Sequence, residues 1–477
     1  MQLNYIANAS VPSLSGKTIA IVDPSDGQVF DQIQRSTAHD IDLAVRSARD
    51  CLERVWCRLS SMERGRLLMR LSNKVAEHAE ELAGIEQRDC GKPTRQAMAD
   101  ALALARYFEF YAGACDKLHG QTIPYLDGYS VMTWREPHGV AGHIIPWNYP
   151  MQIFGRSVGG ALAAGNVCVI KPSEDACLSL LRVAELAAEV GFPAGAINIV
   201  TGYGHEVGDA LARHPGIDHI SFTGSPSVGT LIQQAAAQRH CPVTLELGGK
   251  SPQIVFADAD LDAAIPAIIT GIVQNAGQTC SAGSRLLVDK EIYEPLLARL
   301  GEAFEKLRVG PAAMDLDLGP LIRQSQQQGV WDFLSDAHVA GIPMVAQGQI
   351  VDEAPESGFY QAPTLLCDVP PDHRLMQEEV FGPVLCAMSF QDEDEAVALA
   401  NGTRFGLAAG IWTRDGARQF RMARRVQSGQ VFINNFGAGG GVELPFGGLK
   451  SSGYGREKGF EALYGFTTLK TVSVRHG

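Results

Sequence analysis

Apolar residues recur every three or four positions between residues 41 and 113, with Arg, Glu and Lys between them and no proline before Pro93. This spacing predicts a series of amphipathic helices. After Tyr125 the pattern changes, and residues 130–134 alternate as a half-buried strand does. The N-terminal quarter of the chain is therefore expected to be helical and to lead into a β-rich part.

From residue 140 onward, short apolar runs alternate with helical stretches. Strands are predicted at 140–145, 167–170, 197–200 and 219–222, with helices at 179–190 and 227–239 between them. A second block has strands at 253–256, 285–288, 384–388 and 430–433, and the chain ends in a strand at 467–475. Alternation of this kind predicts α/β architecture, a parallel sheet with helices on both faces.

Length and charge narrow the possibilities. A chain of 477 residues is too long for one hydrophobic core, so two or three domains are expected. The 40 Lys and Arg against 53 Asp and Glu give a net charge of −13. This excess of acid argues against nonspecific nucleic-acid binding. The most apolar segment, 157–170, is too short to span a membrane, so no membrane partner is expected.

The ten cysteines are scattered, with no C-x-x-C pair and no histidine at metal-ligand spacing. Neither a disulfide framework nor a metal site is expected. Reduced thiols and the lack of a visible signal peptide favour a cytoplasmic protein.

One of these cysteines lies in a different setting from the others. Cys280 follows the polar, glycine-bearing segment 275–279, between an apolar helix-like run at 264–273 and the strand at 285–288. On such a turn a thiol can be exposed, approached by backbone N–H groups and ionised, so Cys280 is a candidate nucleophile. The alternative is an inert buried cysteine.

Seven segments, in order along the chain, resemble the aldehyde dehydrogenase superfamily. They are Pro146-Trp147-Asn148-Tyr149-Pro150, Lys171-Pro172-Ser173-Glu174, Phe222-Thr223-Gly224-Ser225, Leu245-Glu246-Leu247-Gly248-Gly249-Lys250, the segment ending at Cys280, Glu378-Glu379-Val380-Phe381-Gly382-Pro383 and Pro445-Phe446-Gly447-Gly448. The resemblance implies a Rossmann-like dinucleotide-binding domain (1–114 and 138–247), a second α/β catalytic domain (248–445) and a small oligomerisation sheet (115–137 and 463–477). It also implies a homodimer or homotetramer that acts on a small-molecule aldehyde.

Three residues are expected to carry the chemistry. The Cys280 thiolate would add to the aldehyde carbon, and the resulting adduct can lose hydride. Glu246 lies between leucines and before two glycines, where burial raises a carboxylate's pKa and suits it to take a proton from water; the alternative is a salt-bridge partner. Asn148 would stabilise the developing oxyanion, a role that rests on the resemblance because asparagines beside proline are usually turn residues.

The cofactor is expected to be NAD, with NADP as the alternative. Lys171 and Glu174 follow a strand, where ligands approach an α/β sheet, and a carboxylate there accepts hydrogen bonds from ribose hydroxyls and repels a 2′-phosphate. Gly224 and Ser225 open a helix that can receive a diphosphate, although the glycines from Gly224 to Gly229 depart from the G-x-G-x-x-G fingerprint. The resemblance adds five further cofactor residues: Trp147, Ser173, Gly204, Glu379 and Phe381.

The expected substrate wall is polar. Tyr149, Gln152 and Arg156 have the spacing of one helical face, and Gln274 precedes the cysteine loop. The loop 437–441 has no large side chains and would leave the entrance wide. These residues suggest a polar, acidic or aromatic aldehyde whose distal group binds Arg156. The alternative is that Arg156 pairs with an acidic residue outside the tunnel.

Other classes of function remain open at this point. A cofactor-independent cysteine thioesterase would use Cys280 and Glu246 alone. That function leaves Lys171, Glu174 and the phosphate turn unexplained. A non-catalytic scaffold on this fold would be expected to have lost Cys280, Glu246 or Asn148. The G-x-S-x-G string at 155–159 fits a serine hydrolase only if a strand ends at Ser157, and the pattern from residue 151 is already helical.

Overall fold

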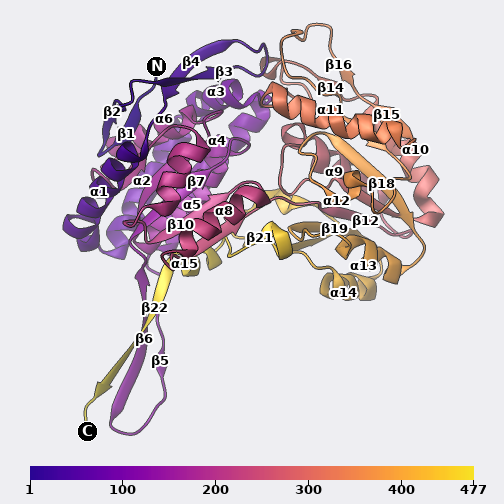
Figure 1. Ribbon diagram of the computed structural model, residues 1–477. Helices are drawn as coiled ribbons and strands as arrows, with labels where there is room; N and C mark the ends of the chain where they lie inside the picture. The colour runs from indigo at the N-terminus through magenta and orange to yellow at the C-terminus, as the bar shows by residue number, and fades with distance from the viewer.

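The computed structural model describes residues 1–437 and 440–477. Two large sheets, each covered by helices, lie side by side, and a narrow arm projects from the first (Figure 1). The helices around the first sheet are α1 (Ala38–Arg54), α2 (Ser61–Glu77), α3 (Ala79–Cys90), α4 (Thr94–Ala114), α5 (Pro150–Ala164), α6 (Leu178–Glu189), α7 (Asp209–Arg213), α8 (Pro226–Ala237) and α15 (Glu461–Gly465). The expected helices within 41–113 are confirmed.

The first sheet has eight strands in the order β2 (Ala9–Val11), β1 (Asn4–Ile6), β9 (Ile197–Ile199), β8 (Val167–Pro172), β7 (Val140–Ile145), β10 (His219–Thr223), β11 (Val243–Glu246) and β21 (Gly453–Tyr454). The five strands from β9 to β11 are parallel. The chain runs outward from β7 through β8 to β9 and then returns to β10 on the other side of β7. The point between β7 and β10 is where the strand order reverses, which in open α/β sheets is where ligands bind.

The second sheet has seven strands in the order β15 (Met344–Gln347), β17 (Thr364–Leu366), β18 (Val384–Phe390), β13 (Arg285–Asp289), β12 (Pro252–Val255), β19 (Ala408–Trp412) and β20 (Gln430–Ile433). All neighbours are parallel except β15. Its helices are α9 (Leu261–Val273), α10 (Tyr293–Phe304), α11 (Gln324–Val339), α12 (Arg374–Gln377), α13 (Glu393–Asn401) and α14 (Gly416–Arg425). The mixed α/β class with parallel sheets is thus confirmed.

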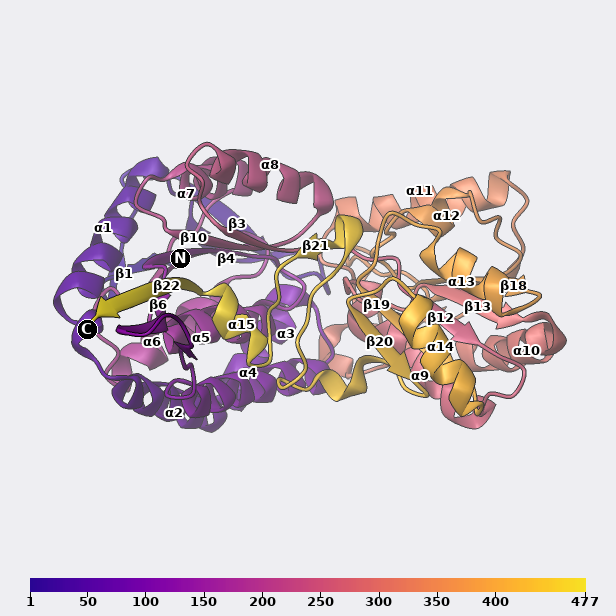
Figure 2. The same cartoon turned by 90° about the horizontal axis from the view of Figure 1, so that it is seen from below.

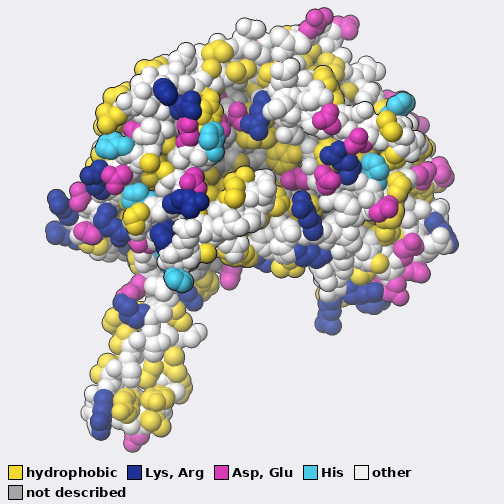
Figure 3. All heavy atoms as spheres, viewed as in Figure 1, with side chains coloured by type: hydrophobic (Ala, Val, Ile, Leu, Met, Phe, Trp, Pro, Cys, Tyr) yellow, Lys and Arg dark blue, Asp and Glu magenta, His cyan; other side chains and the backbone are white. Residues whose placement is uncertain are grey.

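The arm is a three-stranded antiparallel sheet. Strand β22 (Thr467–Arg475) pairs along its whole length with β6 (Tyr129–Pro137), and the short β5 (Thr122–Ile123) lies on the other side. Exposed apolar side chains gather toward the tip of the arm (Figure 3), namely Ile123, Tyr125, Leu126 and Val474, and Trp134 and Leu469 are also exposed. The terminal strand was predicted with these bounds.

Two further strand pairs complete the fold. They are β3 (Thr18–Val22) with β4 (Val29–Gln34), and β14 (Arg308–Val309) with β16 (Gln349–Ile350). Seen from below, the first sheet with its helices and the second with its own form two lobes, and the segment that contains β21 returns from the second lobe to the first (Figure 2). The division into domains at the expected boundaries remains a prediction.

Two buried cores match the two lobes, one built mainly from residues before 250 and one from residues 254–426. The link between them is short, because β11 ends at Glu246 and β12 begins at Pro252. Segments that follow strands of the first sheet therefore meet segments that precede strands of the second. The expected site residues fall on these two sets of segments, with Glu246 at the end of β11 and Cys280 before β13.

Within the part of the chain that the structure describes, no helix is both long and apolar enough to cross a membrane.

Candidate active site

The loop that carries Cys280 is held in an unusual backbone conformation. Asn275, Ala276 and Gly277 have φ of 50°, 52° and 75°, so three consecutive residues lie in the left-handed region. Such a conformation is costly for asparagine and alanine and persists only where the surroundings fix it. At Gly277 a side chain has no room, because a Cβ would lie 2.2 Å from the carbonyl carbon of Gly382.

Hydrogen bonds from buried amides fix this loop. The Asn275 side chain donates to the carbonyl oxygens of Asn148 (2.9 Å) and Gln278 (3.3 Å). The Gln278 side chain donates to the Asn275 carbonyl (3.0 Å) and accepts from the Ile322 backbone N–H (2.9 Å). The backbone N–H of Asn275 donates to the Gln96 side chain (2.9 Å). Asn275, Gln278 and Gln96 are thus site residues that the sequence reasoning did not single out.

The setting of Cys280 differs from the expectation in one respect. Its side chain is only partly exposed, and burial raises the pKa of the thiol to about 12. Arg156 opposes this rise, whereas Glu379 and Glu246 add to it through charge repulsion of the thiolate. Burial thus works against the ionised thiol that the sequence predicts, and Arg156 offsets only part of this effect. Ionisation of Cys280 stays a prediction.

Glu246 is buried, as its leucine neighbours predicted, with 2% of its surface exposed. Neither carboxylate oxygen has a hydrogen-bond partner among the described residues. Desolvation raises the pKa of Glu246 well above the usual range, and the nearby Glu457 raises it further, while Arg156 and Arg456 oppose the rise. The salt-bridge alternative is not what the structure shows. A buried carboxyl group without partners is suited to exchange a proton with a bound molecule.

Asn148 is also buried, and its side-chain amide donates to the Gln278 carbonyl at 3.1 Å. It therefore lies against the cysteine loop. Tyr149 next to it makes a hydrogen bond of 2.9 Å with the Thr279 hydroxyl. The segment that follows β7 thus holds the loop that precedes β13.

The expected cofactor residues follow strands β7 to β10. Lys171 and Glu174, after β8, form an ion pair of 2.8 Å, and a Cβ at Gly204, after β9, would lie 3.9 Å from the Lys171 ammonium nitrogen. Ser225, after β10, caps α8 by accepting from Val228 N–H at 3.4 Å, and Gly224 N–H donates to the Glu246 carbonyl at 3.0 Å. The Ser173 hydroxyl accepts from the Asp175 N–H, which tightens the same turn.

Of the remaining three, Trp147 follows β7 in the first lobe, and Glu379 and Phe381 come from the second lobe. The ring of Phe381 meets that of Trp147 edge to face, with 5.4 Å between centroids. Glu379 accepts from the Gly249 N–H at 3.1 Å, and desolvation raises its pKa to about 7. At Gly249 a Cβ would lie 2.3 Å from the Cys280 carbonyl oxygen, so only glycine lets the two segments approach this closely.

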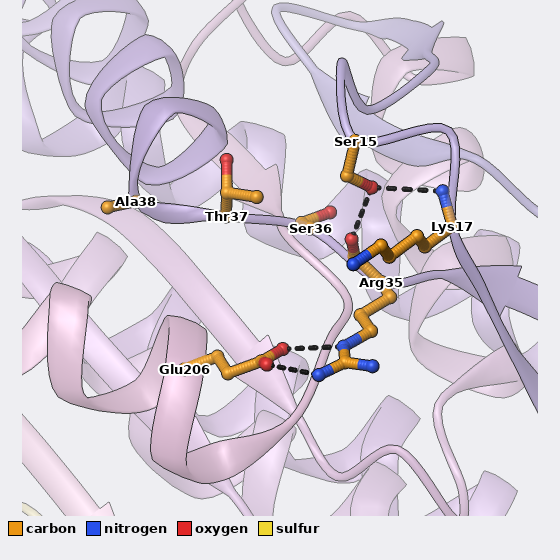
Figure 4. Close-up of a pocket in the computed structure, with 7 residues that line it drawn as sticks. All are labelled: Ser15, Lys17, Arg35, Ser36, Thr37, Ala38 and Glu206. Carbon is orange, nitrogen blue, oxygen red and sulfur yellow. Dashed lines mark hydrogen bonds and ion pairs between the residues drawn. The ribbon is translucent and has the colours of Figure 1, made fainter.

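A surface cavity of about 540 Å³ opens beside the Gly204 turn (Figure 4). Arg35 and Glu206 face each other across it in a bidentate ion pair, and Ser15 and Lys17 lie at its rim. None of the residues that line this cavity belongs to the group around Cys280, so we do not place the chemistry there.

Comparison with known proteins agrees with this geometry. The family model described as "Aldehyde dehydrogenase family" matches residues 11–472. An aldehyde dehydrogenase from Emericella nidulans is 41% identical over 475 residues, which is 99% of this chain and 95% of the relative. A hydroxyisobutyraldehyde dehydrogenase from Mycolicibacterium austroafricanum is 41% identical over 473 residues, 99% of this chain and 93% of the relative.

This chain belongs to the aldehyde dehydrogenase family. Among solved structures, a provisionally assigned aldehyde dehydrogenase from Burkholderia cenocepacia is 71% identical, with a TM-score of 0.99 and full coverage of both chains. The structure of PnpE in complex with nicotinamide adenine dinucleotide is 40% identical, with a TM-score of 0.97, and covers 100% of this chain and 98% of PnpE.

For a member of this family, the substrate wall needs two corrections. The Arg156 guanidinium is buried and forms an ion pair with Glu457, and it lies 4.8 Å from the centre of the Phe446 ring. It also lies near Cys280 and Glu246, since its charge interacts with both. Arg156 therefore pairs with an acidic residue, as the alternative held, but that residue, Glu457, lies within the site and not outside it. An Arg156 that is free to bind the distal group of a substrate is not what the structure shows.

Gln152 is also engaged elsewhere. Its amide donates to Asp100 at 2.5 Å, and Asp100 forms an ion pair with Lys92, which also pairs with Glu86 at 2.5 Å. Lys92 is fully buried and lies 4.3 Å from the centre of the Tyr149 ring. The cluster of Glu86, Lys92 and Asp100 therefore holds the Gln152 amide in place, and contact of Gln152 with substrate stays a prediction.

Three smaller expectations are also resolved in part. Gln274 is exposed, and its carbonyl accepts from the Thr279 hydroxyl at 3.4 Å. Ser157 lies inside α5 and donates to the Ile153 carbonyl at 2.8 Å, so it is not at a strand-to-helix elbow. The expected wide entrance at 437–441 falls partly outside the described residues, at positions 438 and 439.

The buried pair predicts a large effect of Glu457→Gln. This change leaves the Arg156 charge buried without its counter-ion, and breaking one side of a buried pair costs about 3 kcal/mol or more. We expect the thermal midpoint of unfolding to fall by several degrees. Glu443→Gln is the matched control, because Glu443 pairs with Arg106 at the surface, where ion pairs contribute little.

The double variant Arg156→Met/Glu457→Leu should lose less stability than the two single changes together, because it leaves no unpaired charge. Equal midpoints for Glu457→Gln and the wild-type protein would contradict the assignment of a strong buried pair.

Proposed function

We propose that this protein oxidises an aldehyde to the carboxylic acid with NAD, through a covalent adduct on Cys280 that water hydrolyses. The observation that carries the proposal is that a thiol, Cys280, lies near enough to Glu246 for their charges to interact, and that Glu246 is a buried carboxyl group without a hydrogen-bond partner among the described residues. A nucleophile and a proton acceptor in one site are the requirements for covalent catalysis followed by hydrolysis.

The residues around the site fit NAD. At the end of β8, Glu174 presents a carboxylate whose pKa is lowered by Lys171 against the opposing effect of burial, so it is charged and can accept from ribose hydroxyls. At the start of α8 Pro226 has no N–H and Val228 N–H donates to Ser225, so the Ser227 N–H and the Ser225 hydroxyl would meet a diphosphate. Trp147, Glu379 and Phe381 lie toward Cys280 and would hold the nicotinamide end. The complexes of PnpE and of a Bacillus cereus aldehyde dehydrogenase with NAD support this choice.

The same carboxylate favours NAD over NADP, because its charge would repel a phosphate on the ribose 2′-oxygen. When bound, NAD supplies the hydride acceptor. The residues of this chain supply the remaining steps.

Cys280 first gives its proton to the carboxylate form of Glu246, and Glu246 releases this proton to solvent before hydrolysis begins, so that it can act as a base again. The sulfur then adds to the aldehyde carbon, and the carbonyl electrons move to oxygen. One amide N–H of Asn148 donates to Gln278, and the other, with the Cys280 backbone N–H, would stabilise this oxyanion. Loss of hydride from the carbon leaves a thioester on Cys280.

Glu246 then takes a proton from water as the water oxygen adds to the thioester carbon. The C–S bond breaks, the thiolate leaves, and the carboxylic acid is released. An enzyme that passes its thioester to a thiol acceptor needs no such base, so Glu246 favours the non-acylating subtype.

We also propose that the arm pairs subunits. The edge of its sheet at β22 carries exposed Leu469 and Val474, and Trp134 on β6 is exposed as well. An exposed apolar sheet edge of this kind is suited to pairing with a second copy. A homodimer or homotetramer follows, and the cytoplasm remains the predicted location.

Cys280→Ala should abolish NADH formation from a panel of aldehydes, because no other group in the proposal forms the covalent adduct. NAD binding, followed by quenching of tryptophan fluorescence, should remain within a few-fold of wild type. Cys57→Ala is the matched control, since Cys57 is an exposed cysteine in the short 3-10 turn that follows α1. Dehydrogenase activity that persists in Cys280→Ala would refute the proposal, and NAD-independent ester hydrolysis alone would favour a thioesterase.

Glu246→Gln should keep the first turnover and slow the following ones. The amide cannot accept a proton from water, so steady-state turnover should fall by about 10² or more, the usual contribution of a general base. Rapid mixing should then show a burst of NADH close to one per active site. A full steady-state rate in this variant would remove Glu246 as the base and would favour the acylating subtype.

A further inference from the structure

Glu457 neutralises the charge of Arg156, so a preference for acidic substrates would have to come from another cation. The next residue, Lys458, provides a second cation. Its side chain is buried, with 7% of the residue exposed, and its ammonium group donates to the Gly440 carbonyl at 2.7 Å. The nitrogen lies 5.8 Å from the centre of the Phe446 ring, the same ring that Arg156 contacts.

Lys458 has no acidic partner at ion-pair distance among the described residues. The carboxylate that stabilises its charge from farther away, Glu443, is itself paired with Arg106. The ammonium group has three N–H donors, and the bond to Gly440 uses one. Lys458 is therefore a desolvated cation with donors to spare, and its charge also interacts with that of Cys280.

The backbone of Lys458 has an unusual conformation that neighbouring hydrogen bonds fix. Lys458 has φ of 62°, a left-handed conformation that a glycine would adopt at lower cost. The segment is fixed by two backbone hydrogen bonds between Phe446 and Glu457 (2.7 and 2.8 Å) and by one from Gly459 to Val442 (2.6 Å). This conformation turns the lysine side chain toward the loop that contains Gly440. Strained residues of this kind cluster at functional sites.

We propose that Lys458 binds the carboxylate of an aldehyde that carries an acid group at its far end, so that the preferred substrates are semialdehydes of dicarboxylic acids. The carboxylate supplies the counter-ion that the buried ammonium group lacks, and a charge-assisted hydrogen bond forms between them. This inference deepens the proposed function and rests on it. Lys458, in place of Arg156, would then bind the distal group of the substrate.

Burial and the neighbouring Arg156 lower the pKa of Lys458 to about 8. The group therefore remains largely protonated at neutral pH. A bound carboxylate would favour the charged form, as an opposite charge at short range does.

The test compares ω-carboxy aldehydes with their methyl esters, which have the same chain but no charge. For each pair, kcat/KM is measured by NADH formation, and the ratio of acid to ester is the readout. We expect the wild-type protein to prefer the acid, and Lys458→Met to lower the ratio roughly tenfold or more. Lys458→Arg keeps the charge and should retain most of the preference for the acid. Thermal melting checks that each variant is folded.

Lys450→Met is the matched control. Lys450 also has a left-handed backbone (φ of 55°) and an ammonium group that donates to two backbone carbonyls, but it is exposed, and the cations over the Phe446 ring in the described structure are Arg156 and Lys458. Its ratio should equal that of wild type. An acid-to-ester ratio of Lys458→Met within twofold of wild type would overturn the assignment of Lys458, and so would a wild-type protein that prefers the ester. Oxidation of the esters would still uphold the proposed function in either case. No NADH from either class would overturn both.

Discussion

The ion pair between Arg156 and Glu457 lies among ionisable groups that the fold buries together. Cys280, Glu246 and Lys458 each interact with the Arg156 charge, and in each case burial disfavours the charged form. In such a medium charges act strongly on one another, so the state of one group depends on the others. Arg156 favours the charged forms of Cys280 and Glu246 and disfavours that of Lys458.

This arrangement has a consequence for catalysis. Burial raises the pKa of both the Cys280 thiol and the Glu246 carboxyl group, and a proton that passes from the thiol to the carboxylate form of Glu246 leaves the net charge of the pair unchanged. Glu457 adds to the raised pKa of Glu246, and Arg156 limits the rise. Burial therefore shifts the pKa values of these groups, and a bound substrate or cofactor that excludes water shifts them further.

Much of the fold could be predicted from the sequence. The alternation of apolar runs identified the central strands β7, β8 and β10 and the terminal strand β22. Strand β19, next to the edge strand β20, was missed because Ala408-Ala409-Gly410 lacks the branched residues typical of strands. The hairpin of β3 and β4 was missed as well, since the chain before residue 41 has no long periodic pattern.

The site was only partly predictable, for a physical reason. Residues such as Glu246 and Cys280 are marked by their immediate neighbours, whereas the partners of Arg156 and Gln152 lie on elements far away in the chain. Glu86 on α3, Lys92 in the link between α3 and α4, and Asp100 on α4 look like exposed charged positions, yet the packing of the two helices buries them. Local spacing gave no sign of that burial.

The central claim is that burial disfavours the thiolate of the partly exposed Cys280 in the free protein. Its most direct test is the rate of alkylation by iodoacetamide at Cys280 as a function of pH, measured without NAD and followed by peptide mass spectrometry. The account predicts a slow reaction whose rate still rises between pH 8.5 and about 10, since a free thiol titrates near 8.5 and burial shifts this one upward. A rate that levels off below about pH 8 would show a thiolate already formed, and would contradict the account.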